Sequence, residues 1–138
     1  MYVIWQGQQR WHDAVDGGRD AGLAHLKELQ NLERLYLSHT KITDKSMECI
    51  KRYRALQYPD LENIPITDLG LAQLKDLTGL RHLNLNRTKI TNDGLTYLQG
   101  MSRLELLQLN DTPVNGGGLN ALKGLRALRV LEIRTSGG

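Results

Sequence analysis

The chain has 138 residues, a formal net charge of +3, 40% apolar residues and 24% charged residues. This ordinary composition excludes a disordered protein and fits a single domain. The single cysteine, Cys49, excludes an internal disulfide, on which small extracellular domains often depend.

The chain begins with MYVIWQGQQRW, which lacks the basic start and apolar run of a signal peptide. No apolar stretch approaches the roughly 20 residues that cross a bilayer. With the single cysteine, these features favour a soluble, cytoplasmic protein without a membrane partner, unless the chain is a piece of a longer one.

Residues 1–21 match poorly the repeat that fills the rest of the chain. Ile4, Trp5 and Trp11 are apolar enough to pack over the first repeat as a cap, because the end of a repeat array needs a cover. The alternative is a broken repeat from a longer array. The sequence leaves both interpretations of this degenerate segment open.

From residue 22 the chain repeats with a step of 24 residues, and no gap is needed between residues 32 and 136. Two of the equivalent sets are Leu35, Pro59, Leu83, Leu107 and Leu131, then Leu37, Leu61, Leu85, Leu109 and Ile133. Apolar residues alternate near the start of each unit, which predicts a strand. They recur every three residues in its second half, which predicts one face of a short helix.

Polar residues mark the expected start of each helix. Thr43, Thr67, Thr91 and Asn115 share one repeat position and have side chains that cap free backbone N–H groups. Asp44, Asp68 and Asp93 then fall in the first turn, where negative charge suits the helix dipole.

The pattern L-x-x-L-x-L-x-x-T-x-I-T-D-x-G-L-x-x-L-x-x-L is clearest over residues 80–101, LRHLNLNRTKITNDGLTYLQGM. It resembles the leucine-rich repeat, in particular the bacterial Thr-containing variant common in planctomycete-type proteins. The resemblance implies an α/β fold over residues 22–138: a right-handed solenoid with about five parallel strands on the concave face and short helices on the convex face. The family's usual Asn, which bonds the turn backbone between coils, is Thr40, Thr88 and Thr112 here, and we expect their hydroxyls to do part of that work.

Two regions depart from the pattern. Pro59 lacks the N–H that a central strand donates, so the coil around residues 56–66 is expected to pair least regularly. The chain stops at Gly138 just after a strand, so Leu128, Leu131 and Ile133 would border an open edge. Truncation, a following domain or end-to-end self-association each explain this edge, and a truncated array is the favoured explanation.

The sequence offers little support for catalysis. The four histidines lack metal-ligand spacing, and Cys49 has no evident activating partner. Gly116–Gly118 opens a helix without the lysine of a P-loop. Asp60 and Glu62 lie two apart on one strand, but an open sheet offers little of the burial that general acid–base pairs need. We therefore predict no enzyme, no cofactor and no metal.

The outward strand positions form three rows, because alternate residues of a strand face opposite sides. The first holds Arg34, Tyr58, His82, Leu106 and Val130; the second Tyr36, Asp60, Asn84, Gln108 and Glu132; the third Ser38, Glu62, Asn86, Asn110 and Arg134. These rows vary in chemistry while the inward rows are almost all Leu or Ile. Tyr and Arg are typical interface anchors.

We therefore predict a protein-interaction module whose concave face binds another protein of unknown identity. Except for Ser38 and Val130, all the row residues are candidate contacts. A specific nucleic-acid partner is not expected, because the basic residues near the helix ends form no coherent stripe. The alternatives are an ordinary solvated sheet, a structural or spacer segment of a longer repeat protein, and, by analogy alone, an adaptor that selects a target for an attached activity.

Overall fold

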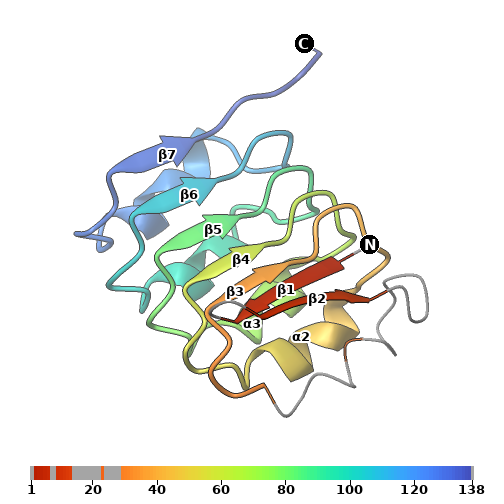
Figure 1. The fold of residues 1–138 in the computed structure, drawn as a ribbon. Coiled ribbons are helices and arrows are strands. Elements are labelled where there is room, and N and C mark those ends of the chain that lie inside the picture. Colours follow the sequence, from red (N-terminus) through yellow and green to blue (C-terminus); the bar gives the residue numbers. More distant parts are fainter. Residues whose placement is uncertain (1, 7–8, 14–22, 24–28, 138) are drawn as a thin grey trace.

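The computed structural model describes residues 2–6, 9–13, 23 and 29–137. Its main body is a right-handed α/β solenoid in which strands line one face and short helices the other, as the sequence predicts (Figure 1). The parallel strands are β3 (Arg34–Tyr36), β4 (Tyr58–Asp60), β5 (His82–Asn84), β6 (Leu106–Gln108) and β7 (Val130–Glu132). Their register pairs residues 24 apart, for example Leu83 with Leu107 and Leu107 with Leu131.

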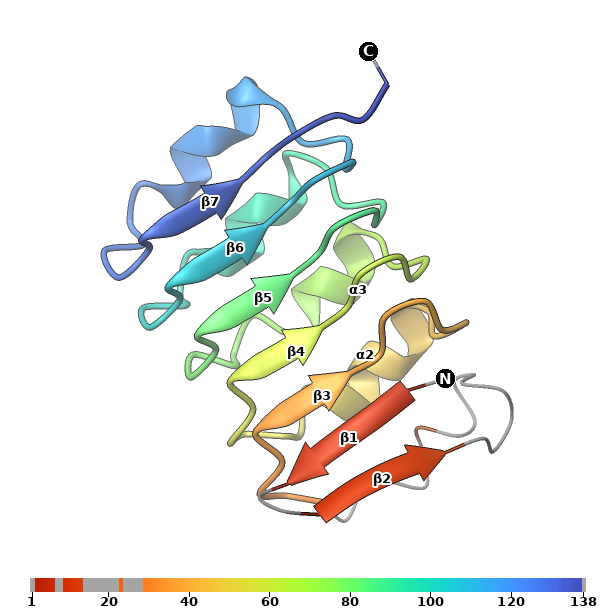
Figure 2. The same ribbon diagram turned by 45° about the horizontal axis from the view of Figure 1, so that its top comes forward.

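Two further strands lie at the N-terminal edge of the sheet, β1 (Tyr2–Gln6) and β2 (Gln9–Asp13). The sheet order is β2-β1-β3-β4-β5-β6-β7, and β1 runs antiparallel to both β2 and β3 (Figure 2). The packing of the Ile4, Trp5 and Trp11 side chains lies outside what the structure describes. The choice between a cap and a partial repeat over residues 1–21 therefore stays a prediction.

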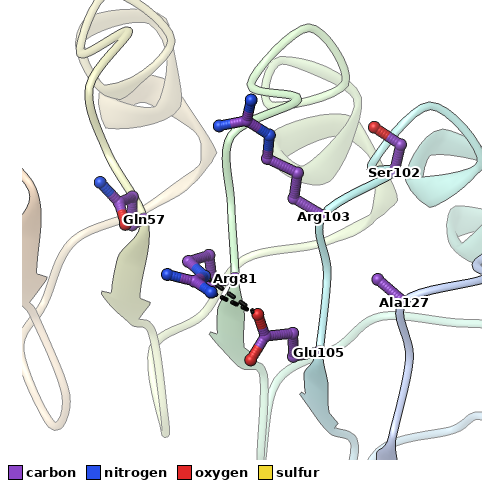
Figure 3. Close-up of a pocket in the computed structure, with 6 residues that line it drawn as sticks. All are labelled: Gln57, Arg81, Ser102, Arg103, Glu105 and Ala127. Atoms are coloured by element: carbon purple, nitrogen blue, oxygen red, sulfur yellow. Dashed lines mark hydrogen bonds and ion pairs between the residues drawn. The ribbon is translucent and has the colours of Figure 1, made fainter.

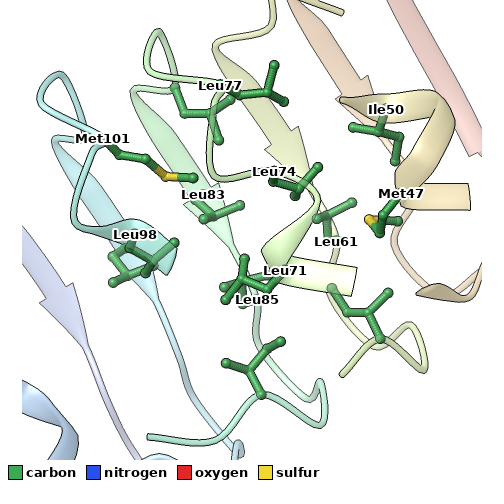
Figure 4. Close-up of a cluster of buried hydrophobic side chains, with 14 of the residues drawn as sticks. Met47, Ile50, Leu61, Leu71, Leu74, Leu77, Leu83, Leu85, Leu98 and Met101 are labelled. Carbon is green, nitrogen blue, oxygen red and sulfur yellow. The ribbon is translucent and has the colours of Figure 1, made fainter. Parts of the chain in front are cut away.

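The core is a column of apolar side chains between the strands and the helices. Leu35, Leu37, Leu83 and Leu85 are fully buried. Figure 4 shows helix residues such as Leu71 beside Leu83 and Leu85 in this core. Tyr53 replaces a leucine in one coil and is also buried, which raises the pKa of its phenol to about 12. Burial of apolar surface is the dominant favourable term in folding.

The helical side holds α2 (Asp44–Ile50), α3 (Asp68–Ala72), η3 (Gly94–Leu98) and η4 (Gly116–Leu122). The last two wind as 3-10 helices rather than α-helices. Leu119, whose repeat position is inward in earlier coils, is 38% exposed because no described coil packs beyond η4. The predicted caps are present: the side-chain oxygens of Thr43, Thr67, Thr91 and Asn115 each accept a hydrogen bond from a backbone N–H two residues ahead.

The residue after each of the first three caps has a second role that the sequence did not reveal. Asp44 accepts hydrogen bonds from the backbone N–H and the hydroxyl of Thr67 in the next coil, at 2.7 and 2.6 Å. Asp68 accepts the same pair from Thr91 at 2.8 and 2.5 Å. Asn92 continues the series by accepting from the backbone N–H of Asn115 at 3.0 Å. We call these three inter-coil pairs the N-cap ladder.

The glycine of the T-D-x-G segment makes room for this ladder. A Cβ at Gly70 would overlap the Asp44 carboxylate, and one at Gly94 would overlap that of Asp68. At Gly118 the same atom would lie 2.5 Å from Oδ1 of Asn92. In this motif, the acidic or amide side chain of one coil therefore occupies the space that the glycine of the next coil leaves open.

After β3, β4, β5 and β6 the chain leaves the sheet through one residue in the left-handed region, with φ values of 60, 54, 57 and 56° at His39, Asn63, Arg87 and Asp111. The buried Thr40, Thr88 and Thr112 follow directly, and each hydroxyl donates to the carbonyl three residues earlier at 2.7 Å. These bonds stay within one coil, so the expected contribution between coils is not observed.

Pro59 disturbs the sheet on one side only. Strand β4 pairs with β3 through three residues, but with β5 only through Asp60 and Asn84. Leu61, two residues later, donates its N–H to the Asn84 carbonyl at 3.0 Å. Pro59 occupies the preceding donor position of the same ladder and has no N–H to give. The expected irregularity is thus confined to the β4–β5 contact, and the 24-residue register survives it.

Candidate functional site

The structure brings the predicted rows together on the exposed face of the sheet. In the second row, Tyr36 pairs with Asp60, Asp60 with Asn84, Asn84 with Gln108, and Gln108 with Glu132. In the first row, Arg34 pairs with Tyr58, and Leu106 with both His82 and Val130. The third-row residues follow the strands. The backbone carbonyls of four of them each accept a hydrogen bond from the N–H of a residue in the preceding coil: Glu62, Asn86, Asn110 and Arg134.

Three side chains of the first row form an ordered cluster. The Arg34 guanidinium lies 4.2 Å from the centroid of the Tyr58 ring, which is cation–π distance. The Tyr58 and His82 rings meet edge to face, 4.9 Å apart at 85°. A side-chain hydrogen bond with Tyr36 is the main cause of a raised pKa at Arg34. We call Arg34, Tyr36, Tyr58 and His82 the aromatic cluster.

The aromatic cluster borders a shallow hollow in the sheet, with a volume of about 160 Å³. Pro59, Asp60, Asn84, Leu106 and Gln108 complete its wall. Arg34 and His82 are exposed, while Tyr36 and Tyr58 are half-buried. The hollow is therefore polar at its rim and partly aromatic.

The amide-rich centre is more occupied than the sequence suggested. Asn84 donates to Glu62 at 3.2 Å, and Gln108 and Asn110 both donate to Glu132, at 3.0 and 3.1 Å. The bonds from Gln108 and Asn110 lower the pKa of Glu132. The Oδ1 atom of Asn110 is buried and has no hydrogen-bond partner among the described residues. These internal hydrogen bonds fix the orientations of the side-chain amides. Fewer of their N–H and C=O groups are therefore free to bond a partner than the number of Asn and Gln residues suggests.

Asp60 and Glu62 do not form an isolated acidic pair. The backbone N–H of Glu62 donates to Oδ1 of Asp60 at 3.1 Å. Burial is the main cause of a raised pKa at Asp60; the hydrogen bond from the Glu62 backbone lowers this pKa, and the Glu62 charge raises it by a smaller amount. Glu62 also lies 3.8 Å from Arg87, which is 3.6 Å from Asp111. Arg87 was not among the predicted site residues, although its repeat position beside the third row would have indicated it.

The described part of the chain shows neither a metal site nor a membrane-spanning helix. No group of three or more His, Cys, Asp or Glu side chains could hold a metal ion there. None of the helices in these ranges has the length and apolar character to cross a membrane. The predicted lack of an enzyme, a cofactor and a metal stays a prediction, as does the cytoplasmic location.

Sequence comparison agrees with the repeat. A family model described as Leucine Rich repeat matches residues 28–51 and 77–98. The chain is a leucine-rich-repeat protein. The match concerns the repeat in general, so the bacterial Thr-containing variant stays a prediction for this leucine-rich-repeat chain. No curated protein matches the chain in sequence.

Two solved structures share the leucine-rich-repeat fold with this chain. Internalin C2 of Listeria monocytogenes is 26% identical, with a TM-score of 0.69 over 78% of this chain. An internalin (inlF) of the same species is 17% identical, with a TM-score of 0.54 over 77% of this chain. The alignments span 44% and 36% of those two proteins, so this chain corresponds to less than half of either one.

Proposed function

We propose that the concave sheet of this leucine-rich-repeat chain binds another protein through the aromatic cluster. The observation that carries the proposal is the contact of Tyr58 with both Arg34 and His82 on the outer face of the sheet. The Arg34 guanidinium lies 4.2 Å from the centroid of the Tyr58 ring, and the His82 ring centroid lies 4.9 Å from it. Folding alone does not require these residue types there. Extended concave faces are the surfaces that repeat proteins use for binding.

Preorganisation supports this proposal. Binding costs less when side chains are already held in place. The contacts within the aromatic cluster hold its rings, and the bonds to Glu62 and Glu132 hold the neighbouring amides. Tyr, Trp and Arg anchors of this kind carry most of the binding energy in protein interfaces.

The test is affinity capture from lysate of the source organism with the purified chain as bait. The variant Tyr36→Ala/Tyr58→Ala/His82→Ala removes the three rings of the aromatic cluster, which lie outside the buried core. Each anchor lost is expected to weaken binding by about 2 kcal/mol. We therefore expect a specific partner, identified by mass spectrometry with the unmodified chain, to be lost with this variant.

A matched variant on the helical side, Tyr97→Ala/Gln99→Ala/Asn120→Ala, replaces exposed residues of similar kinds. It should retain the partner. Equal capture by all three proteins, with unchanged circular dichroism, would exclude the concave face as the binding site.

One observation favours a second candidate, the predicted end-to-end self-association. Val130 is 47% exposed and Leu131 38% exposed, and β7 has no pairing partner on its outer side among the described strands. Leu131 belongs to the inward row, which is fully buried at Leu35, Leu83 and Leu107. We propose that β7 pairs with β7 of a second copy, because an exposed strand edge is a template for pairing.

Light scattering tests this candidate. The chain is expected to approach twice its monomer mass as its concentration rises, and Leu131→Glu should keep it monomeric. Leu69→Glu, at a 75% exposed leucine far from β7 in sequence, should leave dimer formation unchanged. A monomer at every concentration would rule out pairing through β7. The adaptor hypothesis rests on no further observation and stays a prediction.

A further inference from the structure

The two edges of the solenoid differ sharply in charge. One edge holds the connections that lead from each helix to the next strand, where the strand arrows begin in Figure 2. These are residues 51–57, 75–81, 99–105 and 123–129, and they contain nine cationic and two anionic residues. The opposite connections, residues 37–45, 61–69, 85–93 and 109–117, contain four cationic and five anionic residues. We call the first the basic edge.

A hollow of about 370 Å³ lies on the basic edge between neighbouring coils. Its walls are Gln57, Arg81, Ser102, Arg103, Glu105 and Ala127, and the Arg103 side chain extends back toward the preceding coil (Figure 3). A second hollow, of about 520 Å³, is bordered by Lys51, Arg52 and Arg54 of one connection, and Asp76 of the next connection is also in its wall. Both hollows open to solvent. The first holds Arg81 and Arg103 of neighbouring connections, and the second gathers three cations of a single connection.

Among the described residues, several of these cations have no ion-pair partner. The ion pairs there involve Lys51, Arg81 and Arg87, but not Arg52, Arg54 or Arg103. Arg81 differs, because its Nε and one terminal nitrogen donate to a single oxygen of Glu105, at 3.0 and 2.7 Å. The hollow thus already holds one carboxylate against one guanidinium through two charge-assisted hydrogen bonds.

We propose that the basic edge binds an acidic segment of a protein, whose carboxylates pair with Arg52, Arg54 and Arg103. This site is separate from the concave sheet and goes beyond the function proposed for it. Coils repeat about every 4.8 Å along the edge, so an extended chain lying across the coils meets cations from successive connections. Opposite charge also steers such a segment toward the edge from solution.

A protein segment fits this edge better than a nucleic acid. Proteins that bind single-stranded nucleic acid combine cations with aromatic rings on which the bases stack. The only aromatic residue in the four connections is Tyr53, which is fully buried. Carboxylates need no such platform.

The experiment measures binding of a fluorescent peptide that alternates glutamate and serine, at low and at physiological salt. The variant Arg52→Gln/Arg54→Gln/Arg103→Gln removes three exposed cations that make no ion pair in the described structure. It is expected to weaken binding about tenfold or more, because each exposed ion pair contributes up to about 1 kcal/mol. Raising the salt concentration should weaken binding to the unmodified chain as well.

The matched control, Lys41→Gln/Lys45→Gln/Lys89→Gln, removes the same charge from exposed residues of the opposite edge. It should bind the peptide within about twofold of the unmodified chain if the edge, rather than net charge, is recognised. Equal weakening by both variants, or no binding at low salt, would overturn the proposal. Tighter binding of a single-stranded oligonucleotide of equal charge would overturn it in favour of a nucleic acid. The concave variant should bind the peptide normally, so failure of either proposal is distinguishable from failure of the other.

Discussion

Replacing Gly94 with alanine is expected to lower the free energy of unfolding by about 2 kcal/mol, although alanine is the better helix former. The added Cβ would overlap Oδ1 of Asp68 and lie 3.2 Å from a methyl group of Ile90. The carboxylate can move aside, but it then gives up its bonds to the backbone N–H and hydroxyl of Thr91. Chemical denaturation followed by circular dichroism measures the change.

Gly100→Ala is the matched control for this variant. Gly100 is in the same coil, and the nearest atom to an added Cβ is the Lys75 carbonyl oxygen at 3.8 Å. The substitution should leave stability unchanged or raise it by up to about 1 kcal/mol, because alanine restricts the unfolded chain. Equal effects of the two substitutions on stability would show that an overlap with Asp68 is not what makes alanine unfavourable at position 94.

Replacing Asp68 with alanine is expected to cost about 2 kcal/mol by removing the acceptor rather than displacing it. A hydrogen bond to a charged group contributes about 1.5–3 kcal/mol. Asp68 accepts two such bonds, but the site is partly exposed to water, so we expect their joint loss to cost little more than the lower value for one bond. The loss leaves the N–H of Thr91 without its partner in the neighbouring coil. Thermal and denaturant unfolding both report it.

Asp93→Ala provides the comparison, because Asp93 is an exposed aspartate in the next coil whose side chain makes no cap hydrogen bond. Its removal should change stability by less than about 0.5 kcal/mol. A cost at Asp93 as large as that at Asp68 would mean that general charge, not the inter-coil bond, accounts for the effect.

The fold was predictable because every coil carries the same pattern of apolar and polar residues. The 24-residue step predicted that inward leucines such as Leu83 and Leu107 lie opposite each other on neighbouring strands, and the observed register pairs them. The caps at Thr43 and Thr67 were predictable for the same reason, since a hydroxyl before a helical run has one common use. The rows on the outer face followed directly from this register.

Features that depend on contacts between coils were not predictable from one unit. Asp44 and Asp68 suit their own helix dipoles, and only the structure shows that each reaches the threonine of the next coil. The repeated T-D-x-G was the available signal, but a glycine at that position also fits a simple turn. The sequence likewise predicted a short helix at η4 without indicating that it winds as a 3-10 helix.

The candidate site was predictable in its position and less so in its chemistry. The sequence placed Tyr58 beside Arg34 and His82, and the structure adds the ring geometry. It did not reveal that Asn84 and Asn110 are engaged by Glu62 and Glu132. The sequence shows which polar groups lie on the surface, but the side-chain conformations decide which of them remain available to hydrogen-bond a partner.

The N-cap ladder connects these observations to function, because the outer rows are contiguous only if neighbouring coils keep their register. The most direct test is a double-mutant cycle between Asp68→Ala and Gly94→Ala. If the carboxylate of one coil occupies the space left by the glycine of the next, Gly94→Ala should cost about 2 kcal/mol in the unmodified chain and almost nothing when Asp68 is already alanine. Additive losses, each undiminished by the other, would contradict this account of how the coils are aligned.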